Sequence, residues 1–338
     1  MARKTRRRPA KQEQLKLVPG DYQFPGEKNG YWVAMGVTIG LFVWLAFMVW
    51  VLRGQMFAPH QLDPLPVIGL PKGPAWWMLN LLAYPWVVIA FANLLATRHS
   101  AAAIKKAGRQ AKVMPNNYPD LHRLLANQTR ISGMNLPNMY LLRAEMPYIY
   151  TIPGGRGTIV LSSGLQEGLD EDELAALIAR ELGHINSHHV RTSLAIKYMT
   201  NANPVFKVLF FPILIIKLFS GGWADLTDFS ADRFAVLVTN NAEALNLALV
   251  RQAVLADKQA DITVEDLEAF LASPGDMAGD SKQMERRFRI GSFIGSQPNL
   301  QERITQISDY LGSDEYIQAM EKMEQLRRKA GAAQSAEG

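Results

Sequence analysis

The segment ALIARELGHINSHH at residues 176–189 carries a glutamate and three histidines at spacings that matter for metal chemistry. In the motif H-E-x-x-H, two histidines one helical turn apart bind one zinc ion, and the glutamate polarises the metal-bound water. Glu181 and His184 stand at the glutamate and second-histidine positions, but Arg180 stands where the first histidine would be. Because a guanidinium has no free lone pair and stays protonated, Arg180 is not a metal ligand.

A second group of carboxylates follows in the segment DFSADRFA at residues 228–235. Asp228 and Asp232 are four residues apart, so on a helix both side chains lie on one face. Zinc sites that use two histidines of one helix take a further ligand from elsewhere, often a carboxylate on a later helix. Asp228 is therefore a candidate ligand.

Another histidine is a candidate replacement for the missing one. His184 and His188 are also four residues apart, so a metal site shifted by one turn would use both, with Asp228 and Glu181. Glu181 would then precede the first ligand by three residues and lose the usual position for activating water. The competing interpretation is that adjacent histidines at a helix end are solvated or cap the helix.

Mixed helical and strand patterns supply the elements that must hold these residues. An acidic capping box at residues 170–173 opens a helix that we extend to about residue 189, and Asp225 is expected to open the later helix through about residue 238. The other expected elements are a helix at 119–131, strands at 138–142, 148–152 and 157–162 with a hairpin turn at 153–155, helices near 242–257 and 263–272, a loop at 273–288, and a solvated helix at 314–329 before a disordered tail.

Two long apolar segments precede this region. Residues 31–52 and 75–96 contain no charged side chain, and each is long enough to cross a hydrocarbon layer of about 30 Å as a helix. Lysine and arginine gather before the first segment and after the second, which predicts that the amino terminus and everything after residue 97 lie in the cytoplasm. A shorter apolar stretch at 208–219, interrupted by Pro212, is too short to span a membrane but favours contact with its interface.

The charge distribution and the absence of cysteine limit the partners and the metal ligands that this chain can use. The net charge of +5 owes much to a basic amino-terminal tail with no interleaved aromatic residues, so we interpret the tail as topogenic and lipid-facing, not as a nucleic-acid site. The chain contains no cysteine, which excludes disulfides and thiolate ligands.

Four segments together resemble the membrane zinc metallopeptidases of the HtpX and CAAX-prenyl-protease type. They are YIYTIPGGRGTIVLSSGL, ARELGHINSHH, DFSADRFA and QPNLQERI, in the family's order and spacing over roughly residues 30–310. The resemblance implies a zincin-like fold and a zinc ion. It also implies that Glu181 is the catalytic base, His184 a ligand, His189 the following histidine and Asp232 a supporting carboxylate.

This chain departs from the family pattern at positions that bind zinc or take part in catalysis. Arg180 takes the place of the first zinc ligand, Asp228 that of the glutamate ligand, and Gln297 that of a later histidine thought to help bind or stabilise the reacting carbonyl. The family's Asn-Ala strand motif falls on residues 148–149, Tyr-Ile in this chain. Aspartate keeps a competent oxygen, whereas arginine offers no ligand at all. Zinc is therefore expected to be absent or weakly bound.

We expect Arg180 to replace the metal in a structural sense. On this hypothesis its guanidinium pairs with Asp228, and with Glu181, in a forked ion pair that joins the two helices as zinc would. The plainer alternative is that Asp228 only caps a helix begun by Asp225 and that Arg180 is an exposed helix residue.

These observations predict an α+β, mainly helical protein with two amino-terminal transmembrane helices and a zincin-like metallopeptidase domain that contains a small β-sheet. The expected parts are a basic tail (1–30), two spans with a short external loop (31–96), the metallopeptidase-like domain (97–312) and a terminal helix with a disordered tail (313–338). In function we expect an inner-membrane pseudoprotease that binds or regulates membrane proteins or proteases. An active zinc endopeptidase with unusual ligands, acting on membrane or misfolded proteins, and a structural scaffold that forms homo-oligomers stay as alternatives.

Overall fold

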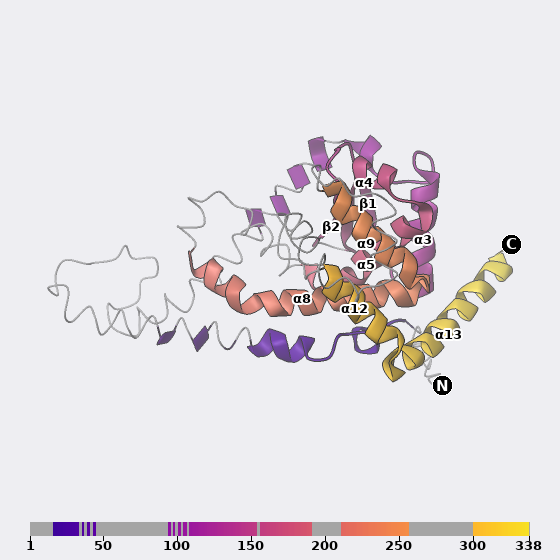
Figure 1. Cartoon of the computed structure of the whole chain (residues 1–338). Helices are drawn as coiled ribbons and strands as arrows, with labels where there is room; N and C mark the ends of the chain where they lie inside the picture. The colour runs from indigo at the N-terminus through magenta and orange to yellow at the C-terminus, as the bar shows by residue number, and fades with distance from the viewer. Residues whose placement is uncertain are drawn as a thin grey trace, which may run out of the picture.

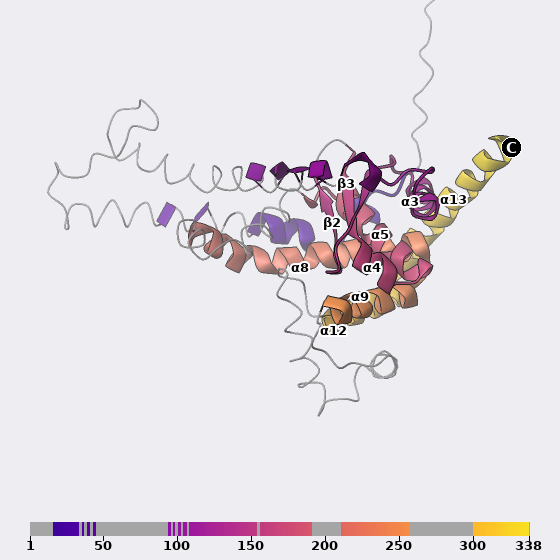
Figure 2. The ribbon, with the colours of Figure 1, turned by 90° about the horizontal axis from the view of Figure 1, so that it is seen from above.

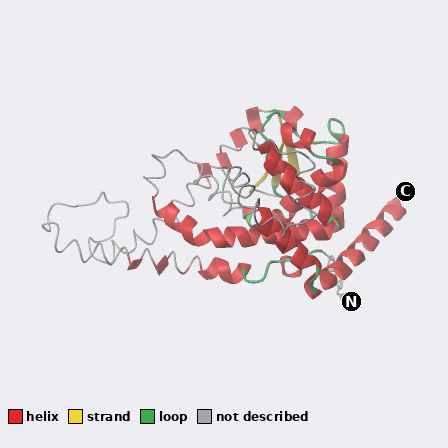
Figure 3. Ribbon diagram, in the orientation of Figure 1, coloured by secondary structure: helices red, strands yellow, loops and turns green. Residues whose placement is uncertain are grey.

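The computed structural model describes residues 16–33, 36, 39–40, 43–44, 94–95, 97–98, 101–102, 104–106, 108–153, 156–190, 211–256 and 300–337 (Figure 1). Within these ranges the protein is mainly helical, with one small three-stranded sheet (Figure 3). The predicted class, mainly helical with a small sheet, is confirmed.

The sheet has the strand order β1-β3-β2. Strand β1 (Asn138–Leu142) runs parallel to β3 (Thr158–Ser162), and β2 (Ile149–Ile152) runs antiparallel to β3. Ile152 pairs with Thr158, so β2 and β3 form the expected hairpin. All three strands lie within one residue of their predicted bounds. Strand β2 lies at the edge of the sheet.

Helix α3 (Pro119–Ser132) begins at a proline and ends at Gly133, whose φ of 71° is left-handed. Helix α5 (Glu171–Asn186) begins with the predicted capping box, in which the Asp170 and Glu173 side chains each accept from the other's backbone N–H. Helix α5 ends earlier than expected, because residue 188 has a φ of 59°, which no helix accommodates.

Helix α8 (Phe211–Thr239) is one continuous helix, and the prediction that Asp225 opens it is wrong. Pro212 does not interrupt an element here. It lies in the first turn of the helix, where its missing N–H would have no intrahelical acceptor. Residues 211–219 of the short apolar stretch and the later polar segment therefore belong to one helix, and residues 208–210 lie outside the described residues.

The other labelled helices of the described part are α4 (Ser163–Gly168), α9 (Ala242–Ala256), α12 (Leu300–Leu311) and α13 (Asp314–Glu337). Seen from above, the sheet lies on one side of α5 and α8, and α9 and α12 lie on the other (Figure 2). Helix α13 runs to residue 337, so the expectation of a disordered end is not met. The alanine-rich sequence AGAAQSAE has high helix propensity, which explains this continuation.

The helices α5 and α8 cross closely at Gly183. A Cβ atom at this glycine would lie 2.9 Å from Cβ of Phe234 and 3.2 Å from Cα of Ala231. Leu177, Ile178 and the ring of Phe234 are fully buried beside this crossing. The absence of a side chain at Gly183 thus lets the two helices that carry the candidate site approach each other.

The two expected membrane spans, 31–52 and 75–96, lie mostly outside the described residues, as do the expected helix at 263–272 and the loop at 273–288. Among the helices of the described ranges, none combines the length and the apolar character needed to cross a bilayer.

Candidate functional site

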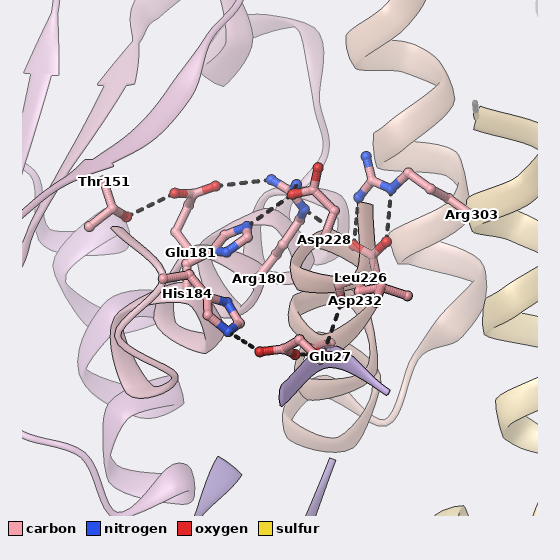
Figure 4. A network of polar contacts seen from close by, with 11 residues as sticks. Glu27, Thr151, Arg180, Glu181, His184, Leu226, Asp228, Asp232 and Arg303 are labelled. Carbon is pink, nitrogen blue, oxygen red and sulfur yellow. Dashed lines mark hydrogen bonds and ion pairs between the residues drawn. The ribbon is translucent and has the colours of Figure 1, made fainter. Parts of the chain in front are cut away.

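Arg180 lies on α5 at its interface with α8 and is only 3% exposed. Its Nη2 is 2.5 Å from Oδ1 of Asp228, its Nε donates to Oδ1 of Asp232 at 3.2 Å, and its Nη1 donates to Oε1 of Glu181 at 3.1 Å (Figure 4). The predicted ion pair with Asp228 and Glu181 is therefore present, and Asp232 adds a third acceptor. The alternative of an exposed Arg180 beside a capping Asp228 is wrong, because Arg180 is buried and Asp228 lies well inside α8.

Arg303 of α12 extends the network from the other side. Its Nε donates to Oδ2 of Asp232 at 2.8 Å and its Nη2 donates to Oδ1 at 2.5 Å, which is the bidentate geometry of a strong guanidinium–carboxylate pair (Figure 4). Asp232 thus receives hydrogen bonds from two guanidinium groups while it is almost fully buried. The network connects three helices.

The charges of this network nearly balance. Arg180 and Arg303 face the carboxylates of Glu181, Asp228 and Asp232, so the buried cluster carries one net negative charge when all five are ionised. Burial would lower the pKa of Arg180, but the charges of the three carboxylates outweigh it and raise the pKa above its usual range. The guanidinium therefore remains a permanent cation.

His184 occupies the position expected for a metal ligand, but neither of its ring nitrogens forms a hydrogen bond among the described residues. The ring is buried, and its Nε2 lies 3.3 Å from Oδ1 of Asp228 without meeting hydrogen-bond geometry. Burial lowers the pKa of His184, and the charge of Arg180 lowers it further against the opposing effect of Asp228. The imidazole is therefore neutral near pH 7.

Both oxygens of Glu181 are engaged. Oε1 accepts from Arg180, and Oε2 accepts from Oγ1 of Thr151 on β2 at 2.8 Å. A general base needs a free lone pair directed at the proton it removes. Each oxygen of Glu181 keeps a second lone pair, but the carboxylate is 4% exposed and is held between the sheet and Arg180.

Asp225 lies one turn before Asp228 on α8 and is about half-buried. Burial, followed by the charges of Asp228 and Glu302, raises the pKa of Asp225 to about 6. Burial is the main cause of this shift in the pKa of Asp225, and the two neighbouring carboxylates add to it.

The donors at this site do not fit a zinc ion. The Oδ1 atom of Asp228 is held by Arg180, and His184 is the single neutral imidazole beside it. A dication in this place would lie next to a fixed guanidinium charge. Across the described residues, no three histidine, cysteine or carboxylate side chains are grouped so that they could hold a metal.

The remaining predicted site residues are separate from this network. His188 is exposed beyond the end of α5, so it does not share a helical face with His184, and the geometric argument for a shifted site fails. His189 is buried and contacts Glu27, at 2.7 Å between Nε2 and Oε1. Gln297 lies outside the described residues.

Three contributors were missed by sequence reasoning: Thr151, Arg303 and Glu27. Arg303 is the only basic residue of the segment QPNLQERI, so the sequence offered it as a partner for a buried carboxylate. Glu27 carried a weaker signal, as an acid just before an uncharged segment. Thr151 carried none, since nothing in the sequence predicts which strand residue faces α5.

Comparisons with known proteins agree with this architecture. The profile of peptidase family M48 matches residues 115–311. A protease HtpX homologue of Helicobacter pylori (strain Shi470) is 30% identical over 129 residues, which cover 37% of this chain and 41% of that protein. The chloroplastic plastoglobule-localized metallopeptidase 48 of Arabidopsis thaliana is 28% identical over 179 residues, which cover 50% of this chain and 49% of that protein.

A protease HtpX homologue of Listeria monocytogenes (serotype 4b, strain CLIP80459) shows a longer match, 24% identical over 264 residues that cover 72% of this chain and 82% of that protein. The chain spans less than half the length of the Helicobacter and Arabidopsis relatives. No solved structure matches it. The family profile covers more than half of the chain, across the helices that carry the buried ion-pair network, and the chain therefore belongs to peptidase family M48.

Proposed function

We propose that this protein is a membrane-anchored pseudoprotease of the M48 family, in which the network of Arg180 replaces the catalytic metal and the domain binds or regulates membrane proteins or proteases without cutting them. The observation that carries the proposal is the triple engagement of the Arg180 guanidinium by Asp228, Asp232 and Glu181. These three carboxylates surround the position at which the family pattern requires a metal ligand.

The chemistry of the substitution supports an inert site. Zinc-dependent hydrolysis needs a metal with an open position and a base that can take a proton from bound water. Here a permanent cation is present that can neither accept a lone pair nor bind water as a Lewis acid. Both carboxylate oxygens of Glu181, the residue at the base position, accept structural hydrogen bonds, one from Thr151 and one from Arg180.

The sheet edge gives the domain a means of holding a partner. Strand β2 is an end strand in the order β1-β3-β2, and we propose that it holds an extended segment of the partner through backbone hydrogen bonds. The half-buried rings of Tyr150 on β2 and of Tyr148, just before β2, lie 5.8 Å apart beside this strand. Binding would then persist where cleavage is lost.

The uncharged segments 31–52 and 75–96 support a membrane anchor, and the basic residues that flank them support a cytoplasmic domain at the inner membrane. A partner reached by this domain would be a membrane protein or a protein close to the bilayer surface.

Restoring the ligands tests the proposal. The Arg180→His, Asp228→Glu double variant should acquire zinc and cleave casein, whereas the wild-type protein should do neither. Glu181→Gln in the restored background is the matched control, since it should keep zinc and lose cleavage. Casein cleavage by the wild-type protein that disappears in Arg180→Met or His184→Ala would contradict the proposal and favour an active endopeptidase with unusual ligands.

Crosslinking separates the regulator from the structural scaffold. A photoreactive side chain at Tyr150 should capture a membrane protein other than this chain, and Thr158, a half-buried residue of β3, is the matched control position. Capture of a second copy of this chain alone would favour a homo-oligomeric scaffold.

A further inference from the structure

The segment that precedes the first expected membrane span is packed into the domain. Leu17 and Tyr22 are essentially fully buried, and the amide of Asn186 at the end of α5 donates to the carbonyl of Leu17 and to the hydroxyl of Tyr22. The Phe24 backbone N–H donates to Oγ of Ser230 at 2.8 Å. We name residues 17–33 the strap.

Glu27 is the central contact of the strap. It is 3% exposed, its Oε1 contacts Nε2 of His189 at 2.7 Å, and its other oxygen accepts from Oγ of Ser230. Burial would raise the pKa of Glu27, but the hydrogen bond and charge of His189 and the hydrogen bonds of Ser230 and Gln23 hold it below its usual value. Glu27 is therefore a carboxylate bonded to two different elements.

These contacts connect the strap to the two helices of the Arg180 network, on α8 itself and just after the end of α5. His189 follows the end of α5, and Ser230 lies on α8 between Asp228 and Asp232. Two residues along an α-helix correspond to a turn of about 200°. Ser230 therefore points away from the side of α8 that faces Arg180, and Glu27 links α8 to the end of α5 at a second place. Figure 4 shows Glu27 below Arg180 and Asp232.

The strap continues into the first expected membrane span. A helix begins at residue 27 and runs beside α8 (Figure 1), and the uncharged segment 31–52 begins four residues later. The ring of Tyr31 lies 5.5 Å from that of Trp223, and a Cβ at Gly30 would lie 3.2 Å from Cδ1 of Leu226. The start of the expected span is thus fixed against α8.

We propose that the strap couples the position of the first membrane span to the spacing of α5 and α8, with Glu27 as the coupling residue. A change in the tilt or height of the span displaces Glu27. Because Glu27 is hydrogen-bonded to His189 and Ser230, this displacement changes the spacing of α5 and α8. The site would thereby respond to bilayer thickness or to a partner that binds the span. This inference rests on the membrane anchoring in the proposed function and is independent of whether the domain cuts proteins.

Hydrogen exchange in bilayers of two thicknesses tests the coupling. Full-length protein is reconstituted into phosphatidylcholine nanodiscs with short or long acyl chains, and exchange is measured at residues 184–190 and 226–232, with β3 as internal reference. The variants are Glu27→Gln and the milder Ser230→Ala, and Lys28→Ala, an exposed neighbour on the same helix, is the matched control.

In the wild-type protein, exchange in both segments should change about fivefold between the two bilayers, since mismatch costs fractions of a kcal/mol per ångström. In Glu27→Gln, exchange there should be about tenfold faster and should no longer depend on thickness, while β3 stays unchanged. Should Glu27→Gln not fold, a reduced thickness response in Ser230→Ala supports the coupling and an unreduced one overturns it.

Three results would overturn the proposal. In the first, the wild-type protein shows no thickness response. In the second, the response persists in Glu27→Gln, and in the third, exchange rises equally in β3, as for a merely structural loss. Alkaline carbonate extraction tests the membrane anchoring by itself. Protein that is released from the bilayer by carbonate would refute the anchoring. The pseudoprotease proposal would then still be tested by the zinc and casein assays.

Discussion

Replacing Asp228 by alanine removes one carboxylate from the buried network and should destabilise the domain by about 3 kcal/mol. Asp228 is 4% exposed and accepts from Arg180 at 2.5 Å. Removal of one partner from a buried ion pair typically costs about 3–5 kcal/mol, because the other charge remains buried. The lower end is expected here, since Arg180 keeps acceptors on Glu181 and Asp232 at 3.1 and 3.2 Å.

The charge balance makes a second part of this prediction. Asp228→Ala leaves two carboxylates facing two guanidinium groups, whereas Arg180→Met leaves three buried carboxylates facing Arg303 alone. Arg180→Met should therefore be more destabilising than Asp228→Ala, by about 1–2 kcal/mol. The reverse order would mean that the network is not governed by its net charge.

Urea unfolding of the full-length protein in detergent, followed by tryptophan fluorescence, measures both variants. Asp309→Ala is the control, since this aspartate is exposed on α12 and its loss should change stability by less than about 0.5 kcal/mol. A chelator should leave the wild-type transition unchanged. An effect of Asp228→Ala as small as that of Asp309→Ala, or a loss of wild-type stability with the chelator, would show that the ion pair does not hold the helices together.

Three further predictions concern neighbouring residues. Gly183→Ala should destabilise the domain by about 2 kcal/mol, because the new Cβ would lie 2.9 Å from Cβ of Phe234; an unchanged melting temperature would show that the helices separate freely. Arg303→Lys should cost about 2 kcal/mol in urea unfolding, because lysine cannot form the bidentate pair with Asp232; equal stability would contradict that pair's role. Burial and neighbouring carboxylates raise the pKa of Asp225 from 3.8 to about 6, so the folded state loses stability as pH rises through this interval. Asp225→Asn should therefore stabilise the protein at pH 7, by about 1 kcal/mol after allowance for its half exposure, and the gain should vanish below about pH 4 in a pH series of melts.

Local sequence signals located the elements of the site well. The capping box at Asp170 placed the start of α5, and the alternation of apolar residues placed the strands, because both depend on neighbours in the chain. The ion pair of Arg180 with Asp228 followed from residue chemistry at positions that the family resemblance aligned.

Two kinds of feature could not be predicted from the sequence. They are contacts between residues far apart in the chain, and helix ends that depend on the rest of the helix. Glu27 and His189 are separated by 162 positions, and no periodicity links them. Asp225 looks like a helix cap locally, but α8 already runs through it from Phe211, because Pro212 is tolerated in a first turn. The terminal helix likewise extends past its polar residues, since alanine sustains it.

Whether the Arg180 network replaces the catalytic metal is best decided by the zinc content of full-length wild-type protein that is purified without chelators. Because the Arg180 guanidinium is held by Asp228, Asp232 and Glu181, we expect far less than one zinc per chain, and no change in His184→Ala. One zinc per chain that disappears in His184→Ala would contradict it, because the arginine would then have to leave the position in which it joins the two helices.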